Sequence, residues 1–314
     1  MCADARSGQP LAHQPVLYHE VLEALRPKAG GRYLDCTVGA GGHAGGTLQA
    51  SLPDGELLGL DVDPGALQIA EQRLAKFGGR VHLRKGSYGL MSQWLADVGW
   101  DLVDGILLDL GVSSMQLDHG DRGFSFKQNA PLGMRFDPEG SLTAEDLVNN
   151  LPEAALADIL YRYGEEPQSR RLAKAIVKAR PLRTTKELAD LIAKTLRKKP
   201  GVIHPATRSF QALRIAVNRE LETLEAALPQ AVAALKSGGR LAVIAFHSLE
   251  DRIVKQFFRT ESKDCICPPE QPVCTCGHTA TLKEITRKPI RPQASEISAN
   301  PRSRSARLRV TEKL

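Results

Sequence analysis

The first residues whose types and spacing could do chemistry are three glycines followed by a histidine: Gly39, Gly41, Gly42 and His43. Glycine has no Cβ, so a turn of glycines lets backbone amides approach a bound ligand closely. The turn directly follows a predicted strand, where α/β proteins hold nucleotide-like cofactors. Dinucleotide-binding enzymes place a similar Gly-x-Gly turn there, so the glycines alone leave the cofactor open.

Three aspartates, Asp35, Asp61 and Asp109, each stand at the end of a predicted strand. Ligands of open α/β sheets bind at the carboxyl ends of the strands, so we expect these carboxylates to meet in one crevice. Asp35 would repel a pyrophosphate but attract the cationic methionine end of S-adenosylmethionine, and Asp61 could accept both ribose hydroxyls. Each aspartate alone could equally cap a helix or turn, but the three together favour S-adenosylmethionine over NAD.

Two more side chains follow predicted strands at positions suited to cofactor binding. Tyr88 comes just after the third strand and could stack on an adenine, although an aromatic residue there could also belong to the core. Gln116, in the loop after the fourth strand, could hold the amino-acid moiety of the cofactor or be a solvated loop amide.

Four cysteines, at positions Cys265, Cys267, Cys274 and Cys276, fall within twelve residues near the C-terminus. The N-terminal segment has no apolar stretch typical of a secretory signal, so a disulfide framework is not expected. Thiolates at this density, with His278 close by, are candidate zinc ligands. The alternative is a flexible loop of reduced cysteines, because two Cys-x-Cys pairs are a less diagnostic spacing than two Cys-x-x-Cys pairs.

The elements that must position these residues alternate between short apolar segments and helical patterns, typical of βαβ units and a parallel sheet. The predicted strands span residues 32–35, 57–61, 81–84, 103–108 and 240–246. A turn is expected at Gly238-Gly239, and segments 281–286 and 306–311 could form a closing antiparallel pair. The predicted fold class is α/β with a doubly wound sheet.

A helical region interrupts this pattern, because no convincing strand occurs between residues 114 and 217. Helices are expected to begin at Thr143 and Thr184, each with an acid three residues later as in a capping box. One long helix is expected over residues 210–228. We therefore predict a sheet domain formed by residues 1–113 and 218–314, with an inserted all-helical domain at 114–217.

Composition and charge bound the function class. The 314 residues contain no run of about 18 apolar residues, so a cytoplasmic enzyme without a membrane span is expected. The net charge is +6, and segments 170–199 and 283–314 are each strongly basic. Either segment could be a solvated helix face or tail, but two of them favour a nucleic-acid partner. No obligate protein partner is evident, and the oligomeric state is not indicated.

Several long motifs resemble one known family: the bacterial small-subunit ribosomal RNA cytosine-N4 methyltransferases of the MraW type. The resemblance runs from about His13 to the C-terminus. The matching segments are HQPVLYHEVLEAL, DGILLDLGVSS, RGFSF, PLGMRFDP, FQALRIAVN, FHSLEDRIVK and NPRSRSARLRV.

This resemblance implies a Rossmann-like class I methyltransferase sheet with an inserted helical domain. It implies methyl transfer from S-adenosylmethionine to the exocyclic N4 of a decoding-region cytidine, with ribosomal RNA or the small ribosomal subunit as partner. The cofactor contacts that it implies are Gly41, Gly42, His43, Asp61, Tyr88, Asp109 and Gln116. Only His43 among them rests on the resemblance alone.

The catalytic group is less clearly indicated. Conjugation with the ring makes the N4 amino group a poor nucleophile, so an acceptor near the end of the fourth strand must align it. Enzymes of exocyclic amines often carry an acid or amide followed by Pro-Pro-aromatic there, whereas this chain has Asp109-Leu110-Gly111-Val112-Ser113-Ser114. Asp109 is the catalytic candidate, with Ser113 and Ser114 orienting the base.

Other side chains could complete the pocket. His247 and the pair Glu250-Asp251 end a later strand, and Phe124, Phe126 and Phe246 could stack on an extruded cytosine. Two other functions stay open: a nicotinamide-dependent oxidoreductase using the same glycine turn, and a non-catalytic RNA-binding assembly factor.

Overall fold

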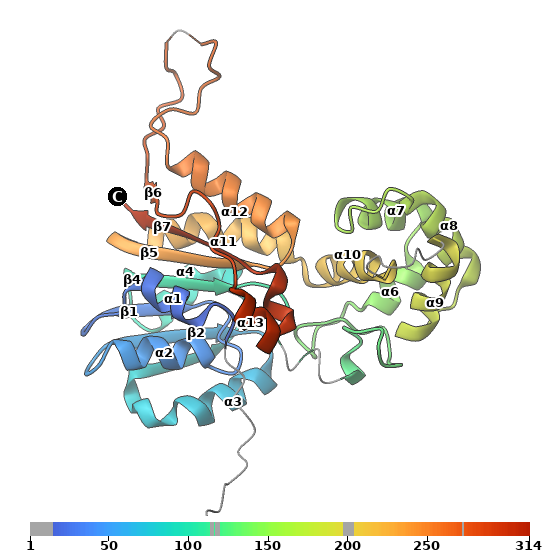
Figure 1. The fold of residues 1–314 in the computed structure, drawn as a ribbon, viewed down its shortest axis with the longest axis horizontal. Helices are drawn as coiled ribbons and strands as arrows, with labels where there is room; N and C mark the ends of the chain where they lie inside the picture. Colours follow the sequence, from blue (N-terminus) through green and yellow to red (C-terminus); the bar gives the residue numbers. More distant parts are fainter. Residues whose placement is uncertain (1–14, 114–115, 117–119, 197–203, 272) are drawn as a thin grey trace, which may run out of the picture.

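The computed structural model describes residues 15–113, 116, 120–196, 204–271 and 273–314. It has two bodies, a sheet covered by helices and a separate group of helices, which are joined through α10 (Figure 1). Ser114 lies outside the described residues. Within the described ranges, no helix combines the length and apolar character needed to cross a membrane.

The sheet has seven strands in the order β3-β2-β1-β4-β5-β7-β6. Their bounds are β1 Arg32–Asp35, β2 Glu56–Asp61, β3 Val81–Lys85, β4 Val103–Asp109, β5 Leu235–Ala245, β6 Leu282–Glu284 and β7 Arg307–Lys313. The first five are parallel, and β7 pairs antiparallel with both β5 and β6. The predicted α/β fold with a closing antiparallel pair is confirmed, and the order reverses between β1 and β4, where ligands of such sheets bind.

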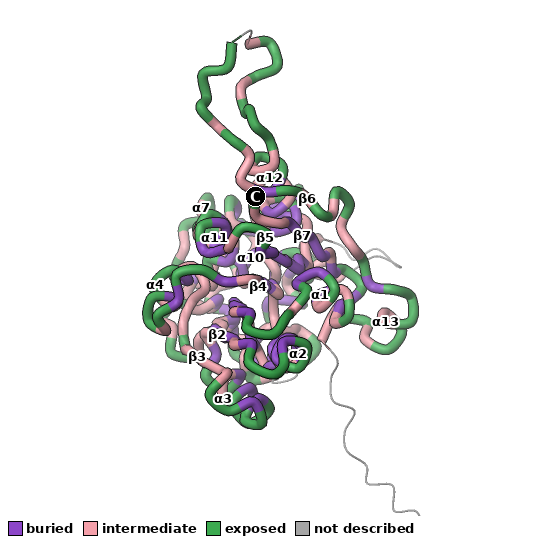
Figure 2. Tube along the Cα trace, turned by 90° about the vertical axis from the view of Figure 1, so that its left-hand side faces the viewer, coloured by how far each residue is buried: buried purple, intermediate pink, exposed green. Residues whose placement is uncertain are grey.

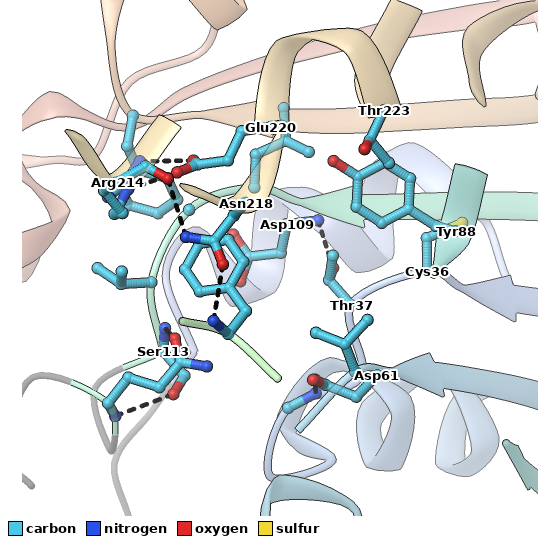
Figure 3. A pocket seen from close by; sticks show the side chains of 18 of the residues that line it. Cys36, Thr37, Asp61, Tyr88, Asp109, Ser113, Arg214, Asn218, Glu220 and Thr223 are labelled. Atoms are coloured by element: carbon cyan, nitrogen blue, oxygen red, sulfur yellow. Dashed lines mark hydrogen bonds and ion pairs between the residues drawn. The ribbon is translucent and has the colours of Figure 1, made fainter. Parts of the chain in front are cut away.

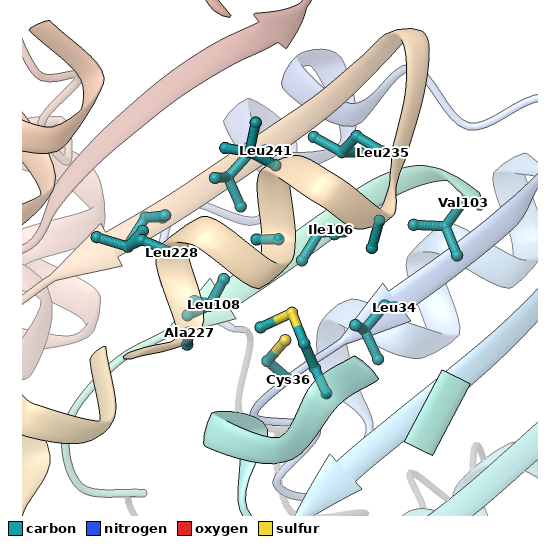
Figure 4. Packing of buried hydrophobic residues seen from close by; sticks show 14 of the residues in the cluster. Leu34, Cys36, Val103, Ile106, Leu108, Ala227, Leu228, Leu235 and Leu241 are labelled. Carbon is teal, nitrogen blue, oxygen red and sulfur yellow. The ribbon is translucent and has the colours of Figure 1, made fainter. Parts of the chain in front are cut away.

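Helices cover both faces of this sheet because its strands alternate apolar side chains between them. Leu34, Ile106 and Leu108 face the helices α4 (Met91–Asp97), α11 (Glu220–Ala234) and α12 (Ser248–Glu261), as Figure 4 shows for the part beside α11. Tyr33 and Leu107 face the opposite side. There the covering helices are α1 (Tyr18–Leu25), α2 (Gly42–Ala50) and α3 (Pro64–Leu74).

The helical body has an apolar core of its own, built from residues between Leu132 and Val217. Its helices are α6 Ala144–Asn150, α7 Glu153–Arg162, α8 Ser169–Ala179, α9 Thr185–Leu196 and α10 Ala206–Asn218. The capping boxes expected at Thr143 and Thr184 both form. The separate core supports an inserted domain, and its limits at residues 114 and 217 remain our proposal.

The prediction of one long helix over residues 210–228 is wrong, because the chain forms two helices there. Arg219 adopts a left-handed conformation (φ 51°, ψ 41°), which ends α10 at Asn218 and lets α11 start at Glu220. No glycine or proline marks this break in the sequence. The turn expected at Gly238-Gly239 forms as a bend within β5, where Gly238 has a positive φ of 78° and the register shifts so that Leu235 pairs with Val103 but Arg240 pairs with Gly105.

The cysteine-rich segment forms a long loop between α12 and β6 that projects from the sheet body (Figures 1 and 2). Most of its described residues are exposed. Its base is held by Thr281, whose N–H donates to the Glu261 carbonyl at 2.8 Å and whose hydroxyl donates to the Glu261 carboxylate at 2.6 Å.

Candidate active site

A cavity of about 850 Å³ opens at the carboxyl ends of β1, β2, β4 and β5. One side is the sheet wall, which we define as the cavity-lining residues at and directly after the carboxyl ends of β1, β2 and β4. The other is the helix wall, formed where α10 meets α11. Figure 3 shows Asp61 and Asp109 on the sheet wall, with Arg214, Asn218 and Glu220 on the helix wall.

The glycine turn shapes the sheet wall between β1 and α2. Gly39 and Gly41 have positive φ angles of 51° and 76°, conformations that favour glycine. A Cβ on Gly41 would lie 3.2 Å from Leu74, so this residue sits against α3, and it does not line the cavity. Gly42 and His43 do line it. Gly41 therefore shapes the turn, and its contact with the cofactor stays a prediction.

Asp61 joins the end of β2 to this turn. Its carboxylate accepts hydrogen bonds from the Gly39 and Asp63 backbone N–H groups, both at 2.9 Å. Burial raises the pKa of Asp61, and these two hydrogen bonds oppose that rise. Each carboxylate oxygen keeps a free lone pair, so Asp61 can still accept ligand hydroxyls.

Asp109 is the most unusual group on the sheet wall. Its Oδ1 atom is buried and has no hydrogen-bond partner among the described residues, while Oδ2 lies 3.7 Å from His43 Nε2. Burial, followed by the charges of Asp35 and Glu250, raises the pKa of Asp109 to about 8. Burial also lowers the pKa of His43 to about 4. Both side chains are therefore predominantly neutral at pH 7.

Asp35 does not meet the other two aspartates in the crevice, so that expectation is wrong. The residue is 3% exposed and does not line the cavity, because β1 is central in the sheet and both of its faces are covered. Burial raises the pKa of Asp35 to about 7. It acts on the site through its charge, which raises the pKa of Asp109.

The loop after β4 is held by a hydrogen-bond network around Gln116. The Gln116 side chain accepts from the Ser113 N–H at 3.1 Å and donates to Asp63 Oδ2 at 3.2 Å. Asp63 also forms an ion pair with Arg122, which in turn donates to the carbonyls of Arg135 and Phe136. Gln116 and Ser113 line the cavity, and both serve at least to fix the loop.

Tyr88 lines the cavity next to Thr223 and also packs against the main sheet core. Figure 3 shows its ring beside Thr223, on the far side of Asp109 from Ser113. This position is compatible with stacking on an adenine and with packing in the core, so adenine stacking stays a prediction.

The helix wall was missed in the sequence, although its residues lie in the motif FQALRIAVN and just after it. Arg214 and Glu220 form a buried ion pair with two contacts of 2.8 Å. Asn218 donates to the Met134 carbonyl at 2.8 Å and accepts from the Phe136 N–H at 2.7 Å. These bonds tie the end of α10 to the segment that precedes α6. The sequence signal that could have revealed this wall is the run of polar residues at the end of the otherwise apolar helix.

The end of β5 contributes His247 and Glu250 to the cavity. They form a capping box on α12, in which the His247 N–H donates to Glu250 Oε2 and the Glu250 N–H donates to His247 Nδ1, both at 3.3 Å. Glu250 also accepts from the Phe246 N–H at 2.8 Å and lies 3.1 Å from His247 Nε2. The charges of His247 and Arg214 hold the pKa of Glu250 below its usual value, against the effect of burial. Asp251 was expected beside them but points to β7, where it pairs with Arg307 and Arg309.

Only Phe246 of the three phenylalanines proposed to stack on a base lines the cavity. Phe124 stacks on Phe136 with ring centroids 5.7 Å apart, and Phe126 packs against Phe210 in the helical body. The expectation for Phe124 and Phe126 is therefore wrong, since their rings serve the insert and do not line the cavity.

The four loop cysteines lie on a different part of the molecule, none of them lining the cavity. Their sulfur atoms all lie within 4.8 Å of one another. The ring of His278 instead contacts the Thr260 carbonyl at 3.1 Å. Zinc binding stays a prediction at this point.

Comparisons with known proteins agree with this geometry. The chain matches the MraW methylase family over residues 10–314. A protein of Geobacter sp. (strain M21) named ribosomal RNA small subunit methyltransferase H is 54% identical, over 96% of this chain and 98% of that protein. One of the same name from Syntrophus aciditrophicus is 52% identical, over 98% of this chain and 99% of that protein.

Two solved structures also resemble the chain. An rRNA methylase from Streptococcus thermophilus does so with a TM-score of 0.42 and 11% identity, over 95% of this chain and 93% of that chain. A protein from Streptococcus mutans, solved in complex with SAH, has a TM-score of 0.45 and 11% identity, over 96% of this chain and 100% of that chain.

The family match covers nearly the whole chain and decides between the two cofactors considered for the glycine turn. It favours methyl transfer over a nicotinamide-dependent oxidoreductase. The chain therefore belongs to the MraW methylase family, and S-adenosylmethionine is its cofactor.

Proposed function

We propose that the protein methylates the exocyclic N4 of a cytidine in the decoding region of small-subunit ribosomal RNA, acting in the cytoplasm. The observation that carries this proposal is the Asp109 carboxyl, whose buried Oδ1 has no partner among the described residues. An unpaired acceptor at the end of β4 suits an amino group that must be aligned and then lose a proton. The substrate class is supported by the name of the full-length relatives.

The residues present fit S-adenosylmethionine. The cavity of about 850 Å³ is within the usual size of cofactor sites, and Gly39, whose positive φ angle of 51° favours glycine, lines it. Gly42, His43 and Asp61 would hold the nucleoside side, with Tyr88 against the base, while Gln116 and Asp109 would face the amino-acid side. The bound cofactor supplies an electrophilic methyl group carried on a sulfonium.

Asp109 has the two properties that the reaction needs from the protein. Oδ1 can accept a hydrogen bond from the N4 amino group and hold its lone pair in line for attack. Methylation makes that nitrogen cationic, and Asp109 in its ionised form, which is the minor form at pH 7, can then take the proton that leaves it. A pKa of about 8 makes Asp109 a stronger base than an ordinary aspartate. Ser113, together with Ser114, which lies outside the described residues, would orient the base.

The target base would enter beside the helix wall. Phe246 lines the cavity and offers an aromatic face on which an extruded cytosine can stack. Arg214, Asn218 and Glu220 are already bonded to neighbouring groups, so they would hold the wall rigid as the base enters. This fixed wall would keep the amino group close to Asp109.

RNA binding would use the exposed face of α8. Arg170, Arg171, Lys174 and Lys178 are all exposed on this helix, and none forms an ion pair with a described acid. The second basic segment contributes less, because Arg307 and Arg309 neutralise Asp251 inside the fold. We therefore place the main contact with the RNA backbone on the insert.

The test is methyl transfer from labelled S-adenosylmethionine to free ribosomal RNA, small subunits and whole ribosomes, with the modified nucleoside identified. The proposal predicts N4-methylcytidine in RNA from the small subunit. A different methylated nucleoside would contradict the base and atom proposed. If the protein binds RNA but methylates none of the three substrates, the alternative function of a non-catalytic assembly factor would be supported instead.

A further inference from the structure

The cysteine-rich loop has almost no apolar support of its own. Two of its apolar side chains, Ile266 and Val273, are 48% and 68% exposed. Its base is tied to α12 and to the C-terminal residue Leu314, whose N–H donates to the Thr281 carbonyl at 3.0 Å. Figure 2 shows the rest of the loop standing away from the body, with mostly exposed residues. Its tip therefore needs another kind of stabilisation to hold one conformation.

The four sulfur atoms lie where a single metal ion would place them. Cys265 Sγ is 3.4 Å from Cys274 Sγ and 3.8 Å from Cys276 Sγ, and the last two are 3.6 Å apart. Cys267 completes the group, with all four sulfurs within 4.8 Å of one another. Zn–S bonds of about 2.3 Å in a tetrahedron separate the sulfurs by about 3.8 Å. A disulfide would need about 2.05 Å, and no pair of described cysteines approaches that.

Backbone amides point at these sulfurs from both sides of the loop. The N–H groups of Ile266 and His278 donate to Cys276 Sγ, both at 3.5 Å, and the Cys267 N–H donates to Cys265 Sγ at 3.4 Å. Four thiolates carry more negative charge than one divalent ion neutralises, so amide donors around the sulfurs stabilise the bound state. This pattern gives the Cys-x-Cys pairs a physical role, because each short turn supplies both ligands and donors.

The donor set also identifies the ion. The His278 ring is engaged by the Thr260 carbonyl at 3.1 Å, which leaves four cysteine thiolates as the ligands. Soft thiolates in a tetrahedral arrangement select zinc over magnesium or calcium, which prefer oxygen. We propose that Cys265, Cys267, Cys274 and Cys276 bind one structural zinc ion that fixes the tip of this loop. The site is separate from the cavity and does not rest on the proposed function.

Metal analysis of the full-length protein tests the proposal. The chain is expressed in zinc-supplemented medium, purified without chelators, and analysed for metals and by native mass spectrometry. We expect about one zinc ion per chain. Zinc well below one per chain, iron in its place, or a mass showing a disulfide between these cysteines would each overturn it.

Matched variants separate the four ligands from other metal-binding groups. Cys274→Ser and Cys265→Ser should each lose the zinc. His278→Ala and Cys36→Ser should keep it, because the His278 ring contacts Thr260 and Cys36 is buried in the sheet core. Zinc retained in both ligand variants, or lost in both control variants, would contradict the assignment.

Two measurements on the unmodified chain exclude a simple folding defect in the variants. Cobalt added to the metal-free protein should give the visible absorption of a tetrahedral thiolate site, and one equivalent of zinc should abolish it. Limited proteolysis should cut the loop between residues 262 and 281 only after chelation, because metal binding is what orders it. Equal cleavage with and without zinc, or no cobalt–thiolate absorption, would overturn the proposal.

Discussion

The two walls of the cavity differ in how completely their buried polar groups are paired. On the sheet wall, Asp109 Oδ1 is buried and unpaired within the described structure. On the helix wall, Arg214 and Glu220 neutralise each other, and both polar atoms of the Asn218 amide are bonded. An unpaired buried acceptor costs stability unless a ligand pairs with it, whereas a paired network fixes geometry. We infer that the sheet wall does the chemistry and the helix wall positions the substrate.

Removing the unpaired acceptor should have the largest effect on activity. Asp109→Ala should reduce methyl transfer by about 10²–10⁴-fold, the usual contribution of a positioned proton acceptor. The fold should stay intact, because Asp109 Oδ1 has no hydrogen-bond partner among the described residues and Oδ2 lies 3.7 Å from its neighbour His43 Nε2, beyond hydrogen-bond distance. Initial rates and circular dichroism measure the two effects. Activity within a few-fold of wild type would remove Asp109 from the mechanism.

Breaking the paired network should act mainly on stability. Arg214→Met leaves the Glu220 carboxylate buried without its partner, which costs about 3–5 kcal/mol in the free energy of unfolding. Burial already raises the pKa of Glu220 despite Arg214, so the unpaired acid should take up a proton. Denaturant unfolding measures the loss, and Arg259→Gln on exposed α12 surface is the control. A loss of stability no larger than that of the control would contradict a rigid helix wall.

The buried acids at the ends of β1 and β4 should make the protein less stable at high pH. The native pKa values of Asp35 and Asp109 are raised to about 7 and about 8, so between about pH 4 and pH 8 the folded state binds more protons than the unfolded state. Stability from these groups is present at low pH and is lost as the pH rises through the folded values. Asp35→Asn should reduce this loss, measured by unfolding at pH 5 and pH 8. An unchanged difference between the two pH values would argue against the buried pair.

The smallest effect should come from the surface of the insert. Arg170→Gln with Lys174→Gln should weaken RNA binding evenly across sequences, and each lost contact should reduce the salt slope by about one. RNA affinity measured at several salt concentrations tests this. Arg259→Gln, which removes one positive charge from another exposed surface, is the control for the effect of losing a charge. Equal affinity and slope in the double variant and the control would place the RNA elsewhere.

The sequence predicted the sheet wall far better than the helix wall. Strand-end acids are local signals, so Asp61 and Asp109 were placed correctly on the cavity, whereas His43 was placed there by the family resemblance alone. Asp35 was misplaced because strand position alone does not reveal that the end of a central strand is covered. Arg214 and Glu220 were missed because a left-handed Arg219 joins their helices, and the helical period does not signal such a break. Asn218 pairs with Met134, a contact that depends on tertiary structure.

The most direct test of the account is the pH dependence of a single turnover on small ribosomal subunits, for the wild type and Asp109→Asn. If Asp109 accepts the proton, the wild-type rate of N4-methylcytidine formation should rise with pH through about 8. The amide variant should be slow at every pH and lack this rise. A variant that keeps the wild-type rate and profile would contradict the assignment of the chemistry to the unpaired carboxyl of the sheet wall.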